Sequence, residues 1–230
     1  MSLLVNIFLE PAKAFRDLQE KPRFLLPLLL VLGSMAVFAM LYHLWVDPEW
    51  FARHQEAMVL AGNPEMTRQE IEQMRQFMPG ARVMAAFSAI GVFLFLGVMY
   101  LVAALYYWLA GKVTGTGIGY LRGLSLAAWS GMPIVLGVLA GLVAMYTSSS
   151  HQAPFESLQL LNIDPLFVQL PLDHDWSQLA KSFSLLNLWT WFLVALGWRT
   201  WFKTGWGQAI TVSLLPSVVI YGIWLILVLV

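Results

Sequence analysis

The 230-residue sequence contains no cysteine and carries few charges for its length. The absence of cysteine excludes a disulfide scaffold and a thiolate metal centre. Thirteen Lys and Arg residues balance thirteen Asp and Glu residues, so the formal net charge is zero. A balanced charge argues against a nucleic-acid partner, because nucleic-acid binding needs a basic surface. The hydrophobic content excludes an intrinsically disordered chain, which combines low hydrophobicity with high net charge.

Hydrophobic residues make up 59% of the chain and charged residues only 11%, against roughly 25% charged residues in an ordinary soluble domain. We therefore interpret the chain as a multi-pass membrane protein. A spanning helix needs about 20 mostly apolar residues, and helices are the default because lipid cannot satisfy free backbone polar groups. The sequence predicts an all-α, single integral membrane domain, a bundle of five transmembrane helices at 24–45, 83–110, 120–146, 182–202 and 207–230.

Residues 1–23 precede the first predicted span and show helical spacing of apolar residues, interrupted by Pro11. This segment is typical of an interfacial amphipathic helix rather than of a signal peptide. Eight Lys and Arg residues lie in the N-terminal segment and in the second and fourth loops, whereas five lie in the longer first and third loops. The positive-inside rule then places the N-terminus in the cytoplasm and the C-terminus in the periplasm of a bacterial inner membrane.

Residues 47–80 are expected to form a helical hairpin on the outer face. Asp47 followed by Pro48 is a typical helix start. Trp50 continues an apolar stripe at helical spacing, and Gly62-Asn63-Pro64 is expected to end this helix and cap the next. The second outer loop, 147–181, is rich in apolar residues and is expected to bury them against the hairpin, the spans or the membrane surface.

Small residues and prolines interrupt the predicted spans. Gly137 and Gly141 form a GxxxG pair, which favours close packing of helices inside the protein, with a dimer interface as the alternative. Pro27, Pro133 and Pro216 lie in three different spans and can kink them. Transporters build their binding sites at such breaks, so a small-molecule or ion transporter or channel is the alternative function, although the cores of these spans carry no ionisable group.

No pattern in the sequence is specific for catalysis, a metal or a cofactor. Asp173-His174-Asp175 is the only cluster with metal-ligand residue types, and adjacent side chains rarely converge on one ion. A lipid-processing enzyme that uses this cluster with Asp47 and His54 is the third hypothesis. The glycine-rich segment 115–119 resembles part of a dinucleotide fingerprint, but it joins two predicted membrane helices, so we interpret it as a turn.

Several short motifs resemble those of one membrane-protein family. Pro11 is followed four residues later by Phe15, and a Pro-containing entry that includes Pro27 opens the first span. The chain leaves this span at Val46-Asp47-Pro48-Glu49-Trp50. The other matching positions are Trp129 and Pro133 in Ala128-Trp129-Ser130-Gly131-Met132-Pro133, Trp189 in Asn187-Leu188-Trp189, and Pro216 before Tyr221-Gly222. Over nearly its whole length the chain resembles the bacterial branch of the Yip family, the Ypt- and Rab-interacting multi-pass membrane proteins.

The resemblance implies five spans with a cytosolic N-terminus, which agrees with the charge distribution. In eukaryotes it implies binding of prenylated small GTPases, but the Asp-Leu-Tyr-Gly-Pro motif and the long polar N-terminal region of those members are missing here. We therefore expect a non-enzymatic scaffold or adaptor that binds protein partners or organises lipid. The expected partners are membrane lipids and a protein or a second copy of this chain, with no nucleic acid and no cofactor.

Overall fold

A computed structural model describes residues 2–63, 65–77, 79–168, 170, 174 and 176–229. The secondary structure of the described residues is helical, with one isolated β-bridge between Asn162 and Ser184 and no strand among them. The chain divides into two compact units. Unit 1 contains Met1–Ser34, Phe93–Leu136 and Leu185–Val230, and unit 2 contains Met35–Val92 and Gly137–Ser184. Three helices run from one unit into the other: α3 (Leu25–Trp45), α6 (Ala81–Val113) and α8 (Pro133–Thr147).

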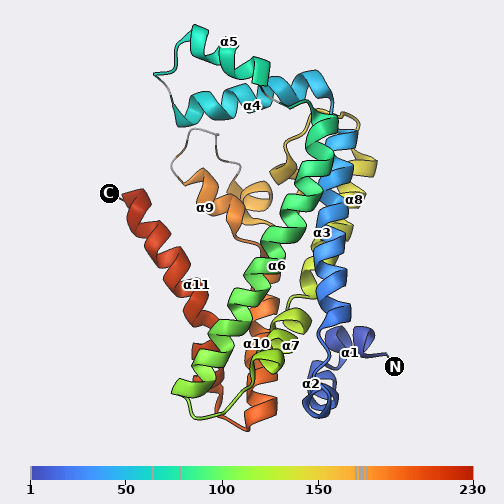
Figure 1. Ribbon diagram of the computed structural model, residues 1–230, viewed down its shortest axis with the longest axis vertical. Coiled ribbons are helices and arrows are strands. Elements are labelled where there is room, and N and C mark those ends of the chain that lie inside the picture. The colour runs from blue at the N-terminus through green and yellow to red at the C-terminus, as the bar shows by residue number, and fades with distance from the viewer. Residues whose placement is uncertain are drawn as a thin grey trace. The chain divides into compact units, whose positions relative to one another are not determined.

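Four helical segments are long and apolar enough to cross a membrane, which confirms the membrane interpretation (Figure 1). They have mean hydropathies of 2.0 to 2.3 and comprise Leu25–Trp45, Ala81–Val113, Tyr120–Thr147 and Trp206–Leu227. The predicted fourth span, 182–202, contains α10 (Leu185–Phe202), which has only 18 residues and is not among the four candidates. Four Trp residues, Asn187 and Arg199 make α10 less apolar than the other candidates. A count of five spans therefore remains a prediction.

The core of unit 1 surrounds α10. Residues 193–198 of this helix are all buried, so α10 is covered on every side over nearly two turns. It packs against α11 (Trp206–Leu229) and against α2 (Pro11–Glu20), and it also contacts α7 (Tyr120–Ser130). The moderate hydropathy of α10 thus accompanies protein contacts rather than exposure to lipid.

The predicted interfacial helix at 1–23 is two helices in unit 1. The first is α1 (Leu3–Leu9), and Pro11 begins α2, where it costs no backbone hydrogen bond. The apolar side of the pair is buried in the core through Ile7, Phe15 and Leu18. This side therefore packs against protein, and a location of the two helices at the membrane interface stays a prediction.

Unit 2 contains the predicted hairpin region as α4 (Pro48–Gly62) and α5 (Arg68–Phe77), tied by an ion pair between Arg75 and Glu56 with Nε and Oε1 3.2 Å apart. The Asp47 carboxylate accepts a hydrogen bond of 2.7 Å from the Trp50 N–H, as expected for an N-cap. The unit also contains short helices at Phe155–Leu158 (η1), Asp164–Val168 (η2, a π-helical turn) and Ser177–Ser182 (α9).

The start of α5 differs from the prediction. Asn63 closes α4, because its N–H donates to the Val59 carbonyl, and Pro64 lies outside the described residues. The N-cap is Thr67, whose N–H donates to the Glu70 carboxylate at 2.8 Å while its hydroxyl accepts from the Glu70 N–H at 3.4 Å. This reciprocal pair is a capping box, and its Thr-x-x-Glu spacing was readable in the sequence.

The three span prolines differ in their surroundings. Pro27 is the third residue of α3. The first N–H groups of a helix have no carbonyl acceptor within the helix, so a proline at this position removes no helical hydrogen bond and does not kink the span. Pro133 begins α8 directly after the turn Gly131-Met132, which breaks the third candidate span in two. Pro216 lies inside α11 and is the one of the three that interrupts a continuous helix.

The capping box makes the first turn of α5 sensitive to acid. The hydrogen bonds from Thr67 lower the pKa of the Glu70 carboxyl below its ordinary value of 4.5. A lowered folded-state pKa stabilises the helix above the unfolded-state pKa, and this stability is lost as pH falls through the folded value. We expect hydrogen exchange of the first α5 amides, corrected for intrinsic rates, to accelerate below about pH 4.5.

The variant Glu70→Ala is expected to show the fast exchange already at pH 6, whereas Glu72→Ala on the same helix serves as the control and should leave it slow. Equal exchange in both variants at pH 6 would contradict the capping role of Glu70.

Candidate functional site

Two tryptophan indoles hold the N-terminal segment onto unit 1. The Trp129 Nε1–H donates to the Arg23 carbonyl at 2.5 Å, and the Ser125 hydroxyl donates to the same oxygen at 3.1 Å. The Trp201 Nε1–H donates to the Phe15 carbonyl at 2.6 Å. These bonds join residues more than 100 positions apart, and buried indoles normally find such acceptors. The N-terminal helices are therefore an integral part of the packed core of unit 1.

Phe15 occupies the centre of this attachment. Its side chain is fully buried and packs edge-to-face on Trp201, with ring centroids 5.9 Å apart. The ring lies directly against Gly197 on α10, where a Cβ would come within 2.8 Å of Phe15 Cε1 and 2.6 Å of Leu126 Cδ1. Gly197 thus permits the close approach of α2 to α10, a role that nothing in the local sequence indicated.

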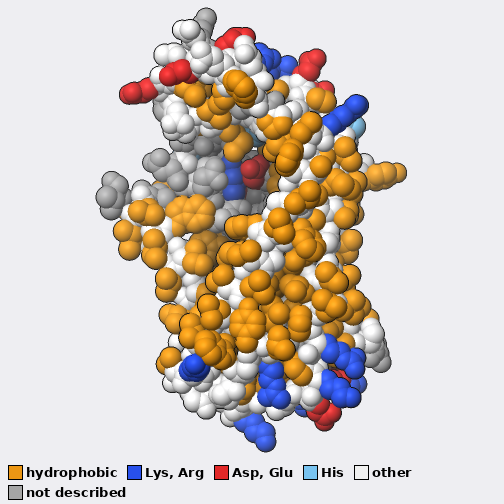
Figure 2. All heavy atoms as spheres, in the orientation of Figure 1, with side chains coloured by type: hydrophobic (Ala, Val, Ile, Leu, Met, Phe, Trp, Pro, Cys, Tyr) orange, Lys and Arg blue, Asp and Glu red, His pale blue; other side chains and the backbone are white. Residues whose placement is uncertain are grey.

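Unit 1 carries eight Lys and Arg residues against three acidic residues, all near helix ends. All eight are exposed, and Figure 2 shows basic side chains gathered at the end of the unit that carries α2. Some are held in place: Arg122 Nη2 donates to the Gln19 carbonyl at 3.3 Å, and Lys112 lies over the Trp108 ring at 3.8 Å. The eight are Lys13, Arg16, Lys21, Arg23, Lys112, Arg122, Arg199 and Lys203.

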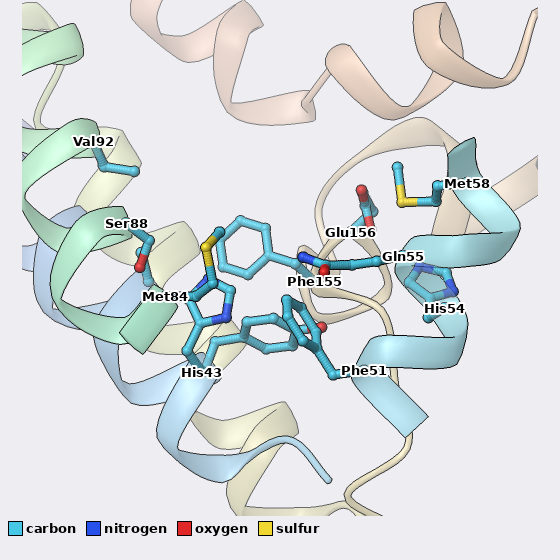
Figure 3. A pocket seen from close by; sticks show the side chains of 12 residues that line it. His43, Phe51, His54, Gln55, Met58, Met84, Ser88, Val92, Phe155 and Glu156 are labelled. Atoms are coloured by element: carbon cyan, nitrogen blue, oxygen red, sulfur yellow. The ribbon is translucent and has the colours of Figure 1, made fainter. Parts of the chain in front are cut away.

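A pocket of about 290 Å³ lies within unit 2 and is partly enclosed by four elements. Its walls come from the last turns of α3, from α4, from the first half of α6 and from η1 (Figure 3). In this view His43 and Met84 lie at one end, and the Glu156 carboxylate lies near Met58 and Gln55 at the other. The lining is mainly apolar and aromatic and includes Ala39, Tyr42, Phe51, His54, Ser88, Val92 and Phe155.

The polar groups of this pocket are incompletely paired. His43 Nδ1 is buried without a hydrogen-bond partner among the described residues, and the Glu156 carboxylate forms no hydrogen bond or ion pair with them. Burial lowers the pKa of the His54 imidazole. The Glu156 carboxylate raises this pKa and the Lys181 ammonium lowers it, both by less than burial does. His54, stacked on Trp50 with centroids 4.8 Å apart, is therefore neutral at pH 7.

The residues of the enzyme hypothesis are not brought together. Asp47 is used as a helix cap, and His174 Nδ1 accepts the Trp176 N–H at 3.2 Å. Asp173 and Asp175 lie outside the described residues. Among the residues whose placement is described, no three His, Asp or Glu side chains converge as metal ligands would.

The remaining predicted positions lie in packing environments. A Cβ at Gly141 would come within 2.6 Å of Phe38 Cζ, so this glycine allows α8 to approach α3, and Gly137 is half-buried. Trp189 packs edge-to-face on Phe8, with centroids 6.1 Å apart. Sequence reasoning missed the Gln55 and Glu156 side chains of the pocket, because no motif connects positions on α4 and η1 that are about 100 residues apart.

Unit 1 also contains a hollow of about 220 Å³ beside the break at Gly131. Its polar lining consists of the Tyr100, Tyr107 and Thr190 side chains, and no charged residue contributes among the described residues that surround it.

The glycine-rich segment 115–119 forms a turn after α6 in unit 1, with positive φ angles of 71° at Gly115 and 65° at Gly117. This left-handed geometry, which glycine tolerates best, is that of a turn between membrane helices.

Comparison with known proteins identifies the family. Residues 5–228 match the Yip1 domain, which is nearly the whole chain. The chain is a member of the Yip1 family. It is similar to the membrane protein YknW of Bacillus subtilis (strain 168), with 24% identity over 220 residues that cover 96% of this chain and 85% of that protein. No solved structure matches the chain.

The Yip1 match begins at residue 5 and thus includes most of α1, all of α2 and nearly all of both units. The attachment of these helices by Phe15, Trp129 and Trp201 therefore lies within the family domain. The resemblance noted from Pro11, Phe15 and the Trp129–Pro133 segment is confirmed at the level of the family.

Gly197 provides a direct test of the attachment. In Gly197→Ala the new methyl group has to displace Phe15 and Leu126, and such overpacking costs about 1–3 kcal/mol. We expect a lower midpoint of thermal unfolding in detergent and faster proteolytic removal of α1 and α2. Gly207→Ala is the matched control, since nothing lies within 4 Å of its Cβ position. Unchanged proteolysis in Gly197→Ala would contradict the role of this contact.

Proposed function

We propose that this Yip1-family protein is a non-enzymatic scaffold of the bacterial inner membrane, which crosses the membrane five times and binds a protein partner or anionic lipid through the basic end of unit 1. The observation that carries the proposal is the attachment of α1 and α2: two buried indoles and Phe15 hold these helices rigidly, while the basic side chains of the same region remain exposed. A rigid, exposed basic surface suits recognition of an acidic one.

The distribution of charge supports the proposed threading. Unit 1 holds eight basic and three acidic residues, whereas unit 2 holds five basic and ten acidic residues together with all four histidines. Lys and Arg accumulate on the cytoplasmic side of membrane proteins. The basic end of unit 1 is thus assigned to the cytoplasm, and the α4–α5 hairpin to the periplasm as an outer cap.

Transport is less well supported. The hollow beside Gly131 is the kind of feature that a transport site needs, because it lies at a broken helix. However, its described lining offers hydroxyl groups without a charge, and intramembrane transport sites are usually marked by ionisable residues. Neither the Yip1 domain nor the name of the YknW relative refers to transport.

The proposal is tested by purifying the full chain from cells after crosslinking, in parallel with a variant that carries Arg16→Glu and Lys21→Glu. Both positions are exposed on or next to α2. We expect the native chain to retain a protein partner or anionic lipid and the double variant to lose most of it, because two charge reversals repel an acidic surface. Equal thermal midpoints of the two proteins would show that the fold is preserved.

A native chain that retains neither a protein nor anionic lipid above the bulk membrane composition would contradict the proposal. An unchanged partner in the double variant would also contradict it, since the basic surface would then play no part in binding. Glu65→Gln in unit 2, where Glu65 is exposed, is the control for a change of charge elsewhere.

A further inference from the structure

The pocket of unit 2 combines an apolar, aromatic body with one unpaired carboxylate at one side. We infer that it binds the ammonium-bearing headgroup of a phospholipid, as in phosphatidylethanolamine, together with the glycerol region of that lipid. The inference goes beyond the proposed function, in which anionic lipid or a protein binds at the basic end of unit 1. It concerns a different unit from the basic surface of α2, so the two can be tested separately.

The ammonium is assigned to the Glu156 side of the pocket. The Glu156 carboxylate lines the pocket and has no partner among the described residues, and neutral His54 adds no competing positive charge there. Aromatic side chains are close by, because Phe155 packs on Tyr42 with centroids 5.1 Å apart and Phe51 also contacts Tyr42. A carboxylate next to aromatic faces is a suitable environment for an organic cation.

An anionic headgroup is disfavoured at this site. A lipid with only a negative charge leaves the Glu156 carboxylate unpaired and repels it, whereas an ammonium pairs with it.

The glycerol region is assigned to the end of the pocket at His43. The imidazole of His43 closes this end of the pocket, while its Nδ1 is buried within the protein. Met84, Val92 and Ala39 provide the apolar surface for the first carbons of an acyl chain.

The position of the pocket fits headgroup depth. Its walls include the last turns of α3 and the first half of α6, which are ends of candidate membrane spans. Trp45 and Trp50 lie at the same junction of α3 and α4, and amphipathic indoles favour the headgroup region. A volume of about 290 Å³ is at the lower limit of ligand pockets, so it accommodates a headgroup rather than a whole diacyl lipid.

Native mass spectrometry of the full chain, released from nanodiscs with equal amounts of phosphatidylethanolamine and phosphatidylglycerol of identical acyl chains, tests the inference. We expect the native chain to retain phosphatidylethanolamine at least about five-fold over phosphatidylglycerol, as a ratio of bound fractions, which corresponds to roughly 1 kcal/mol. Glu156→Gln is expected to bring this ratio close to one. Glu72→Gln, an exposed acidic position on α5 outside the pocket, is the control and should keep the native ratio.

The absence of cysteine allows an independent readout. A single Met58→Cys substitution places a thiol in the pocket lining, and we expect phosphatidylethanolamine, but not phosphatidylglycerol, to slow its reaction with a maleimide several-fold. Equal retention of the two lipids by the native chain would overturn the inference. A Glu156→Gln variant with the same ratio of bound phosphatidylethanolamine to phosphatidylglycerol as the native chain would also overturn it. Protection of the introduced thiol by free phosphoethanolamine as strong as that by the lipid would overturn the assignment to a lipid.

None of these results depends on capture of a partner by α2. A native chain that retains its partner but shows no lipid selectivity would refute only the pocket inference. A native chain that shows lipid selectivity but retains no partner would refute only the proposed role of the basic surface.

Discussion

The structure depends on one constraint: the hydrocarbon of a membrane offers no hydrogen-bond partner to backbone N–H and C=O groups and does not solvate charged side chains. The four candidate spans are continuous or nearly continuous helices for this reason, and their charged residues lie at helix ends. The same constraint gives the buried indoles their importance. Trp129 and Trp201 donate to backbone carbonyls of the N-terminal segment, and this fixes α1 and α2 to α7 and α10 without any charged contact in the core.

The two units divide the charge of the chain between them. Unit 1 is basic and unit 2 is acidic by the same margin, although the whole chain is neutral. The basic side chains of unit 1 surround helices that are held by packing, so a partner finds a surface that needs no reordering. In unit 2 the polar groups instead line a pocket that contains three aromatic rings, two imidazoles and one carboxylate. The proposed protein contact and the proposed lipid contact thus belong to different parts of the molecule.

Features with a local cause could be predicted from the sequence, and features with a distant cause could not. The Asp47-Pro48 helix start and four apolar helices long enough to cross a membrane follow from neighbouring residues, and the structure contains them. The cap of α5 at Thr67 also has a local signal, and it was wrongly assigned to Asn63-Pro64. The burial of Phe15 against Gly197 depends on residues about 180 positions apart, as the pocket depends on α3, α4, α6 and η1, and no periodicity in one segment contains that information.

The central claim is that the chain crosses the membrane five times. This count requires α10 to span the membrane, although this short and Trp-rich helix is less apolar than the four candidate spans. The most direct measurement is a pair of alkaline phosphatase fusions, which are active only outside the cytoplasm, placed after Gly205 and after Leu229. Five crossings with a cytoplasmic N-terminus predict an inactive fusion after Gly205, between α10 and α11, and an active fusion after Leu229. An active fusion after Gly205 together with an inactive one after Leu229 would show that α10 does not cross the membrane, and would contradict this account.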